Sequence, residues 1–469
     1  MNSIPNITPI DDALIEKVRE VVDGDFAKRI GDLGRLVKIE GIAWDAFDAA
    51  NLEISAEAVA ELLRETGVFD LVEIRRAELD GVAGSPAVVA RRAPKNGKPT
   101  FLLYAHHDVQ PPGNLDDWET PPFEPTLKNG RIYARGAADD KAGIVAHLTA
   151  LETIKKVLGE DFDLGISVFI EGEEEAGSRT FRTFLDENRD ILAADAIVVA
   201  DSGNWTAEIP ALTTTLRGLV SQVIEVSTID HALHSGMYGG VVPDAMTATI
   251  RLLASLHTED GSVAVEGLVS GTASELPYTE AELRRDAGAE EPLELIGNGS
   301  ILDRIWAKPS ITVIGIDGQS VALSSNTLLP RVKAKISMRI APGEVPENAL
   351  ALLRAHLEKN LPFGAKLTYH DVELGKPFKA DASGWAQSLA ESALKAAFEN
   401  ETALIGIGGS IPFIADLTEV FPNAQILVTG VEDADSRAHS PNESVEVASL
   451  KKAMVAEALM LIKANELVE

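Results

Sequence analysis

The sequence predicts an α/β fold, in which a mainly parallel sheet is sandwiched by helices and carries an inserted α+β domain. Two observations lead to this prediction. In the first half of the chain and again near its end, short apolar runs alternate with amphipathic helical patterns, which is typical of a parallel sheet covered by helices. In the middle, several alternating strand patterns accompany two helical patterns, which is typical of a compact α+β domain.

The first part of the chain supplies most of the expected sheet. Helical periodicity predicts helices at 11–36, 56–66 and 142–158, and Ser55 is the expected N-cap of the second helix. Short apolar or β-rich runs predict strands at 71–74, 87–90, 101–104, 165–170 and 196–200. These elements alternate as in consecutive strand–helix–strand units, so we expect a mainly parallel sheet covered by helices.

The middle of the chain has a different pattern, beginning near residue 212. We expect strands at 219–227, 310–316 and 332–340, helices at 244–256 and 346–358, and a polar, acidic connection at 271–292. The sheet pattern then returns with a strand at 425–429 and a helix at 447–464. We therefore divide the chain into 1–211, 212–379 and 380–469, where the first and last parts form one domain and the middle part is inserted.

Composition limits the partners and the chemistry. The chain has 42 Lys and Arg against 73 Asp and Glu, and its net charge of −31 repels nucleic acid and anionic membranes, so we expect neither as a partner. It shows no secretory signal and no run of membrane-spanning length, so we expect a cytoplasmic protein. It has no cysteine, so any transition metal must be held by His, Asp and Glu.

Polar side chains suited to metal binding recur at expected strand ends and in loops. They form five clusters: His106-His107-Asp108, 136–141, 171–178, Asp201-Ser202-Gly203 and 439–443. Each cluster alone has an ordinary explanation, such as a polar turn, a helix N-terminus or a solvated acidic run. Together they place many carboxylates at one edge of the expected sheet, an arrangement that is unfavourable unless cations neutralise it. A binuclear metal site explains all five clusters at once.

These segments resemble the di-zinc exopeptidase superfamily, which includes carnosinase-type dipeptidases, aminoacylases, succinyl-diaminopimelate desuccinylases and glutamate carboxypeptidases. The resemblance runs from the helix near Asp11 to the C-terminus, and it includes Trp118 with the Pro121-Pro122-Phe123 loop and the segment 130–136. It is closest to the carnosinase-type dipeptidases. It implies a zinc-exopeptidase-like catalytic domain in 1–211 and 380–469, and a lid and dimerisation domain in 212–379.

The resemblance also implies a metal site and a general base. It makes five residues metal ligands, with Asp139 bridging the two ions: His106, Asp139, Asp201, Glu175 and His439. Two divalent ions per subunit are implied, Zn²⁺ first, with Mn²⁺ or Co²⁺ as alternatives. Glu174 would act as the general base toward a water that bridges the metals.

Two further residues of the first cluster receive different roles from the resemblance. Asp108 would orient His106 from behind. His107 matches a variable position and is not expected to be a ligand. The resemblance implies, in addition, a cis peptide bond between Asp139 and Asp140.

Substrate-binding residues are expected mainly in the inserted domain. His234 lies in a histidine-serine-glycine segment, and in dimeric relatives such a histidine reaches the active site of the neighbouring subunit and stabilises the oxyanion. Asn326 and Arg339 match positions that contact substrate, and an arginine suits a substrate carboxylate. Gly409 and Ser410 resemble a loop that receives the C-terminal end of the substrate. A homodimer through the inserted domain is implied.

Three functional hypotheses follow. The first is metal-dependent hydrolysis of dipeptides or short peptides with a free C-terminal carboxylate, favoured because Asp201 stands where the deacylase and carboxypeptidase branches usually have glutamate. The second is an N-acyl-amino-acid deacylase or desuccinylase with the same mechanism. The third is a metal-free binding or scaffold protein, which the intact set of ligands and base disfavours.

Overall fold

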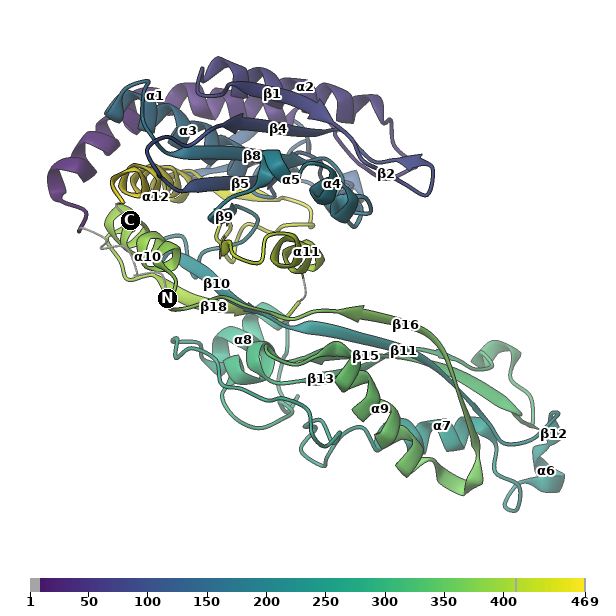
Figure 1. Cartoon of the computed structure of the whole chain (residues 1–469). Coiled ribbons are helices and arrows are strands. Elements are labelled where there is room, and N and C mark those ends of the chain that lie inside the picture. The colour runs from purple at the N-terminus through teal and green to yellow at the C-terminus, as the bar shows by residue number, and fades with distance from the viewer. Residues whose placement is uncertain (1–8, 410, 468–469) are drawn as a thin grey trace. The chain divides into compact units, whose positions relative to one another are not determined.

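The computed structural model describes residues 9–409 and 411–467 of the 469-residue chain. The chain divides into two compact units (Figure 1). Unit 1 comprises Met1–Thr214, Ala380–Ile405 and Asp416–Glu469, and unit 2 comprises Thr215–Lys379 and Gly406–Ala415. Among the helices of the described residues, none has both the length and the hydropathy that a bilayer crossing requires.

Unit 1 is built on a large mixed sheet. Its strands lie in the order β1 (Leu71–Arg75), β4 (Ala87–Arg92), β8 (Gly165–Glu171), β5 (Thr100–His106), β9 (Ala196–Val199), β19 (Gln425–Val428) and β10 (Ala211–Leu216), and β18 (Ala403–Ile407) also pairs with β10. The four central strands, from β8 to β19, are parallel, whereas both flanks are antiparallel. The predicted α/β class with a mainly parallel central sheet is confirmed.

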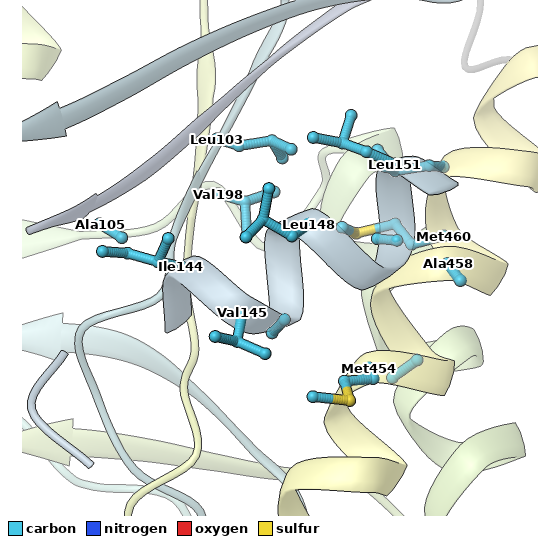
Figure 2. Packing of buried hydrophobic residues seen from close by; sticks show 14 of the residues in the cluster. Leu103, Ala105, Ile144, Val145, Leu148, Leu151, Val198, Met454, Ala458 and Met460 are labelled. Carbon is cyan, nitrogen blue, oxygen red and sulfur yellow. The ribbon is translucent and has the colours of Figure 1, made fainter. Parts of the chain in front are cut away.

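One face of this sheet carries the main hydrophobic core. The helices that contribute to it are α1 (Asp12–Val37), α2 (Ala50–Glu65), α3 (Lys141–Leu158), α10 (Trp385–Phe398) and α12 (Val447–Glu466). Figure 2 shows α3 at the centre, with Leu148 directed toward Val198 of β9 and with Met460 of α12 beside it. Burying a side chain of this size stabilises the fold by about 1.5–3 kcal/mol, so this helical layer holds the central strands in place.

The opposite face of the sheet is aromatic near β8. Because side chains alternate along a strand, Tyr104 points away from the core that its neighbours Leu103 and Ala105 join. Its ring meets Phe169 and Phe181 edge to face, at centroid distances of 5.6 and 6.0 Å. Phe181 begins α4 (Phe181–Glu187), so the chain that follows β8 is packed back onto the strand.

Unit 2 contains a four-stranded antiparallel sheet in the order β13 (Ser310–Asp317), β15 (Arg331–Ile340), β11 (Gly218–Ser227) and β16 (Lys366–Gly375). Along β15 every second residue is buried, and these residues pack with α7 (Ala245–Ala254) and α9 (Pro346–Asn360) in a separate core. A short ribbon pairs β12 (Leu233–His234) with β14 (Thr327–Leu328). The short helix α6 (Ser235–Tyr238) follows β12 directly.

Two local predictions differ from the structure. Ser55 is not an N-cap: α2 begins at Ala50, whose backbone N–H donates to Asp48 at 3.0 Å, and Ser55 lies buried inside the helix. The acidic connection in the middle of the chain contains a helix, α8 (Glu280–Ala287). Its capping box, formed by Thr279 and Glu282, is visible in the sequence as a Thr-x-x-Glu pattern and predicts a helix start. The polar, acidic composition of the stretch had suggested only a connection.

Candidate metal centre

The side chains of the candidate metal centre come together at the carboxyl ends of the parallel strands of unit 1. His106 is the last residue of β5, and Glu174 and Glu175 follow β8 in a single 3-10 turn. Asp201 follows β9. Two loops complete the set: Asp139 lies just before α3, and His439 lies between β19 and β20 (Ser444–Glu446). Parallel strands end at one edge of a sheet, which is why these distant segments meet.

Asp139 lies between the two histidines. Its Oδ1 is 3.0 Å from Nε2 of His106, and its Oδ2 is 3.0 Å from Nε2 of His439. Asp201 Oδ1 lies 4.0 Å from the His106 nitrogen, and Glu175 Oε2 lies 3.2 Å from the His439 nitrogen. The donors therefore form two groups that share one carboxylate, as two ions bridged by Asp139 would require.

The charges of this donor set fit divalent cations. Hydrogen bonds to Asp139 and Glu175 raise the pKa of His439 to about 11 in the protein without metal. The two carboxylates therefore favour a positive charge at this position. Burial raises the pKa of Asp201 to about 7, and the carboxylates of Asp139 and Glu175 add to the rise. Carboxyl groups crowded in this way ionise together only when positive charge lies among them. His106, Asp139 and Asp201 would hold one ion, and Asp139, Glu175 and His439 the other.

Asp108 orients residues of both donor groups. Nδ1 of His106 lies 3.1 Å from the Asp108 carbonyl oxygen and 3.4 Å from its Oδ1, which leaves Nε2 available to a metal. The Asp108 carboxylate also accepts hydrogen bonds from the backbone N–H groups of Glu174, at 3.2 Å, and Glu175, at 3.0 Å. One buried aspartate therefore positions a histidine and two glutamates.

Replacing Asp108 with asparagine is expected to weaken metal binding by about 10- to 100-fold. An amide presents one acceptor oxygen and one NH₂ group, so one of the two backbone N–H donors would face another donor. The measurement is the dissociation constant of Zn²⁺ in a chelator-buffered titration. Asp116→Asn, an exposed substitution, is the matched control, and unchanged affinity in the Asp108 variant would contradict the positioning role.

Glu443 fixes the backbone of the loop that carries Asp139, a role that was not predicted from the sequence. Its fully buried carboxylate accepts hydrogen bonds from the backbone of Ala138 at 3.0 Å, Asp139 at 3.2 Å and Gly136 at 3.1 Å. The guanidinium of Arg135 donates to it at 2.7 Å. In the sequence, Glu443 is visible only as the last residue of the polar cluster 439–443, because its hydrogen-bond partners lie about 300 residues away in the chain.

Gln110 is a second residue whose role the sequence did not reveal. Its backbone N–H donates to Oε1 of Glu175 at 3.1 Å, and its side-chain amide donates to Oε2 at 2.7 Å. Both oxygens of the candidate ligand are thereby held. The amide follows the first histidine cluster by two residues, which is the only local hint.

His107 lies apart from the other polar residues of its cluster. Its Nε2 is 2.8 Å from the Pro86 carbonyl oxygen, and burial lowers its pKa to about 4, so the ring is neutral. It does not join the donor set. The peptide bond between Asp139 and Asp140 is cis, as the resemblance implies.

The candidate substrate residues lie in unit 2, where the structure groups them in two places. His234 on β12 pairs with Thr327, and the carbonyl oxygen of Asn326 accepts a hydrogen bond from Ser235 at 2.9 Å, so His234 and Asn326 are neighbours. The imidazole of His234 is exposed, and its Nδ1 accepts from Gly236 at 3.1 Å.

Arg339 lies near the opposite end of β15 from β14, across from Ser310 of β13. Arg217 donates to Ser310 Oγ at 3.0 Å and to the Gly408 carbonyl oxygen at 2.9 Å, and it thereby connects this region to Gly409. Burial lowers the pKa of Arg217 to about 10, and the charge of Arg339 contributes. Ser410, the remaining predicted residue, lies outside the described residues.

Comparisons with known proteins identify the family of the chain. Residues 102–463 match the model of peptidase family M20/M25/M40. The cysteinylglycine-S-conjugate dipeptidase of Corynebacterium striatum is 33% identical over 386 residues, which cover 81% of this chain and 84% of that protein. The Beta-Ala-His dipeptidase of Rattus norvegicus is 26% identical over 465 residues, 94% of this chain and 93% of the relative.

A solved structure extends the likeness to the fold. Human carnosine dipeptidase 1 superposes with a TM-score of 0.73 at 24% identity, covering 98% of this chain and 100% of that one. The family match spans most of the chain and includes the candidate centre, from the β5 strand to α12. The chain therefore belongs to peptidase family M20/M25/M40, and it is a metallopeptidase.

Proposed function

We propose that this enzyme hydrolyses the amide bond of dipeptides or short peptides with a free C-terminal carboxylate. The observation that carries the proposal is the position of Asp139 between His106 and His439, with Glu174 beside Asp201 at the same centre. Relatives that cover most of the chain are dipeptidases, which supports this substrate class over N-acyl amino acids.

The proposed cofactors are two divalent ions per subunit, and Zn²⁺ is the first choice because the donors are imidazoles and carboxylates. When bound, such ions lower the pKa of the attacking water and polarise the scissile carbonyl group. The protein's own part is to hold the donors in two groups around Asp139. Mn²⁺ and Co²⁺ accept the same donor set.

Glu174 is the proposed general base. Its backbone is held by Asp108, and its carboxylate offers an oxygen within 4.8 Å of the donor atoms of His106 and Asp201. From there it takes a proton from the attacking water and passes it to the leaving nitrogen of the peptide. Burial and the charge of Asp201 raise the pKa of Glu174 to about 9 in the protein without metal, and bound cations would lower it again.

We further propose a homodimer formed through unit 2. His234 and Asn326 lie toward one end of unit 2, and Arg339 lies toward the other, so a partner subunit would bring the first pair to a substrate held by the second group. Exposed apolar side chains near β12 and β14 suit such an interface: Met237, Tyr238, Val241, Val321 and Leu323.

In this dimer His234 would donate a hydrogen bond to the oxyanion formed at the partner's active site. The guanidinium of Arg339 would bind the C-terminal carboxylate of the substrate, beside Gly409 and Ser410. We place the enzyme in the cytoplasm, because a fold without cysteine does not depend on an oxidising compartment.

A substrate panel tests the proposed function. We expect the metal-loaded enzyme to hydrolyse unblocked dipeptides at least about tenfold faster than N-acetyl and N-succinyl amino acids, because the relatives are dipeptidases. Activity should be lost on treatment with a chelator and return with Zn²⁺, Mn²⁺ or Co²⁺. The measurement is kcat/KM for each substrate. Faster hydrolysis of the acylated amino acids would favour the deacylase alternative and overturn the proposal.

A further inference from the structure

Glu432 lies beside the candidate metal centre, but it is neither a proposed metal ligand nor the proposed general base. It follows β19, and its backbone pairs with the turn after β9: its N–H donates to Ser202 at 3.4 Å, and its carbonyl oxygen accepts from Asn204 at 2.7 Å. Asp201, a candidate metal ligand, immediately precedes Ser202 in that turn. The two turns therefore hold Glu432 next to the centre.

The close approach of these two turns fixes the position of Glu432. A Cβ atom on Gly430 would lie 1.8 Å from the Ser202 carbonyl oxygen, so only glycine fits there. A Cβ atom on Gly203 would lie 3.2 Å from the Glu432 carbonyl oxygen, so the chains are in contact on that side as well. The backbone of Glu432 is thus set by packing on two sides.

The Glu432 side chain is partly buried, and it lies near enough to Asp139 and Asp201 for their charges to act on it. Burial raises its pKa well above the ordinary value, and the largest contributions from charges come from Asp139 and Asp201. Within the part of the chain that the structure describes, no hydrogen bond or ion pair reaches its side chain. The buried acids Asp108 and Glu443 differ in this respect, because each accepts several hydrogen bonds.

The charge of the centre leaves Glu432 unmatched. Two divalent ions carry four positive charges, and these are balanced by the three ligand carboxylates and the general base: Asp139, Asp201, Glu175 and Glu174. Arg135 matches Glu443. A further positive group beside the metals would therefore stabilise the ionised form of Glu432, which burial and the neighbouring carboxylates otherwise disfavour.

We propose that Glu432 binds the α-ammonium group of the N-terminal residue of the substrate, and that it thereby selects peptides with an unblocked N-terminus. This inference rests on the proposed function and names the group that distinguishes its substrates. In an unblocked dipeptide the ammonium nitrogen is two bonds from the scissile carbonyl carbon, so the group that binds it must lie beside the metal centre. An N-acyl amino acid has no such cation and would leave the carboxylate unpaired.

Two substrates that differ only in this ammonium group test the inference. Alanyl-glycine carries it, and propionyl-glycine is the same molecule with hydrogen in its place. We expect Glu432→Gln to lower kcat/KM for alanyl-glycine by about 10- to 100-fold, mainly through KM, as the loss of a hydrogen bond to a charged group predicts. The rate with propionyl-glycine should change by less than about threefold. Glu432→Asp should keep part of the preference for the ammonium.

The controls separate substrate binding from structure. Asp435→Asn removes an exposed charge from the same loop and should leave both substrates unaffected. Bound metal should be equal in the wild type and in Glu432→Gln. Equal losses for both substrates, or a loss of metal, would overturn the role of Glu432 while leaving the peptidase function intact. A wild-type preference for propionyl-glycine would instead overturn the proposed function, and this inference with it.

Discussion

Replacing Glu174 with glutamine is expected to lower kcat by about three orders of magnitude, within the range of a lost general base. Glutamine has nearly the same shape but does not accept a proton from water at neutral pH. The backbone N–H of residue 174 would still donate to Asp108, so the turn should keep its position. The measurement is kcat on the best dipeptide of the panel, together with metal content, which should remain at the wild-type level.

The neighbouring acid in the same run provides a matched control. Glu173 accepts hydrogen bonds from Ser85 at 2.9 Å and from the backbone of Thr180 at 2.6 Å, so its carboxylate anchors a loop and does not enter the centre. Glu173→Gln should therefore change stability more than kcat. A Glu174 variant with nearly wild-type turnover, or a larger loss in the Glu173 variant, would show that the base is assigned to the wrong residue.

Replacing Asp139 with asparagine should abolish binding of the second ion and lower kcat/KM by at least about a thousandfold. Its two oxygens face different histidines, and an amide retains only one of them as an acceptor and carries no charge. The measurement is the number of ions bound per subunit by elemental analysis. The rise in Tm that metal produces in the wild type should shrink in parallel, because ligand binding stabilises the folded state.

Wild-type enzyme stripped by a chelator is the control for this variant. Its activity and its rise in Tm should return when metal is restored, whereas the Asp139 variant should recover neither at the same metal concentration. Two ions bound by Asp139→Asn with wild-type affinity would contradict a bridging role. That result would mean that His106 and His439 find sufficient ligands in Asp201 and Glu175 alone.

Local patterns were sufficient to predict the fold class and most elements of unit 1. Helical periodicity marks α3 and α12 within a few residues, and the apolar runs mark the central strands. The meeting of the polar clusters could be expected as well, because residues directly after parallel strands converge at one edge of the sheet, whereas the assignment of ligands came from the resemblance. His106 and Asp201 owe their proximity to this rule.

Residues that support the centre were harder to predict, because their partners are distant in the chain. Glu443 binds backbone N–H groups more than 300 residues earlier, and no spacing in the sequence encodes that contact. Glu432 is similar, since its place depends on the pairing of two turns that follow different strands. The prediction that Ser55 is an N-cap was wrong for another reason. Its side chain donates to the carbonyl oxygen of His107 at 3.3 Å, and this tertiary contact outweighs the preference of serine for a helix end.

The position of β19 in the sheet has a consequence for synthesis of the protein. β19 lies between β9 and β10, so the sheet of unit 1 stays open until residue 428 has left the ribosome. His439 emerges later still. Unit 2, whose main segment is the continuous stretch Thr215–Lys379, can fold before that point. A nascent or truncated chain therefore lacks a central strand and one of the proposed metal ligands, and we expect peptide hydrolysis to begin only when translation is nearly complete.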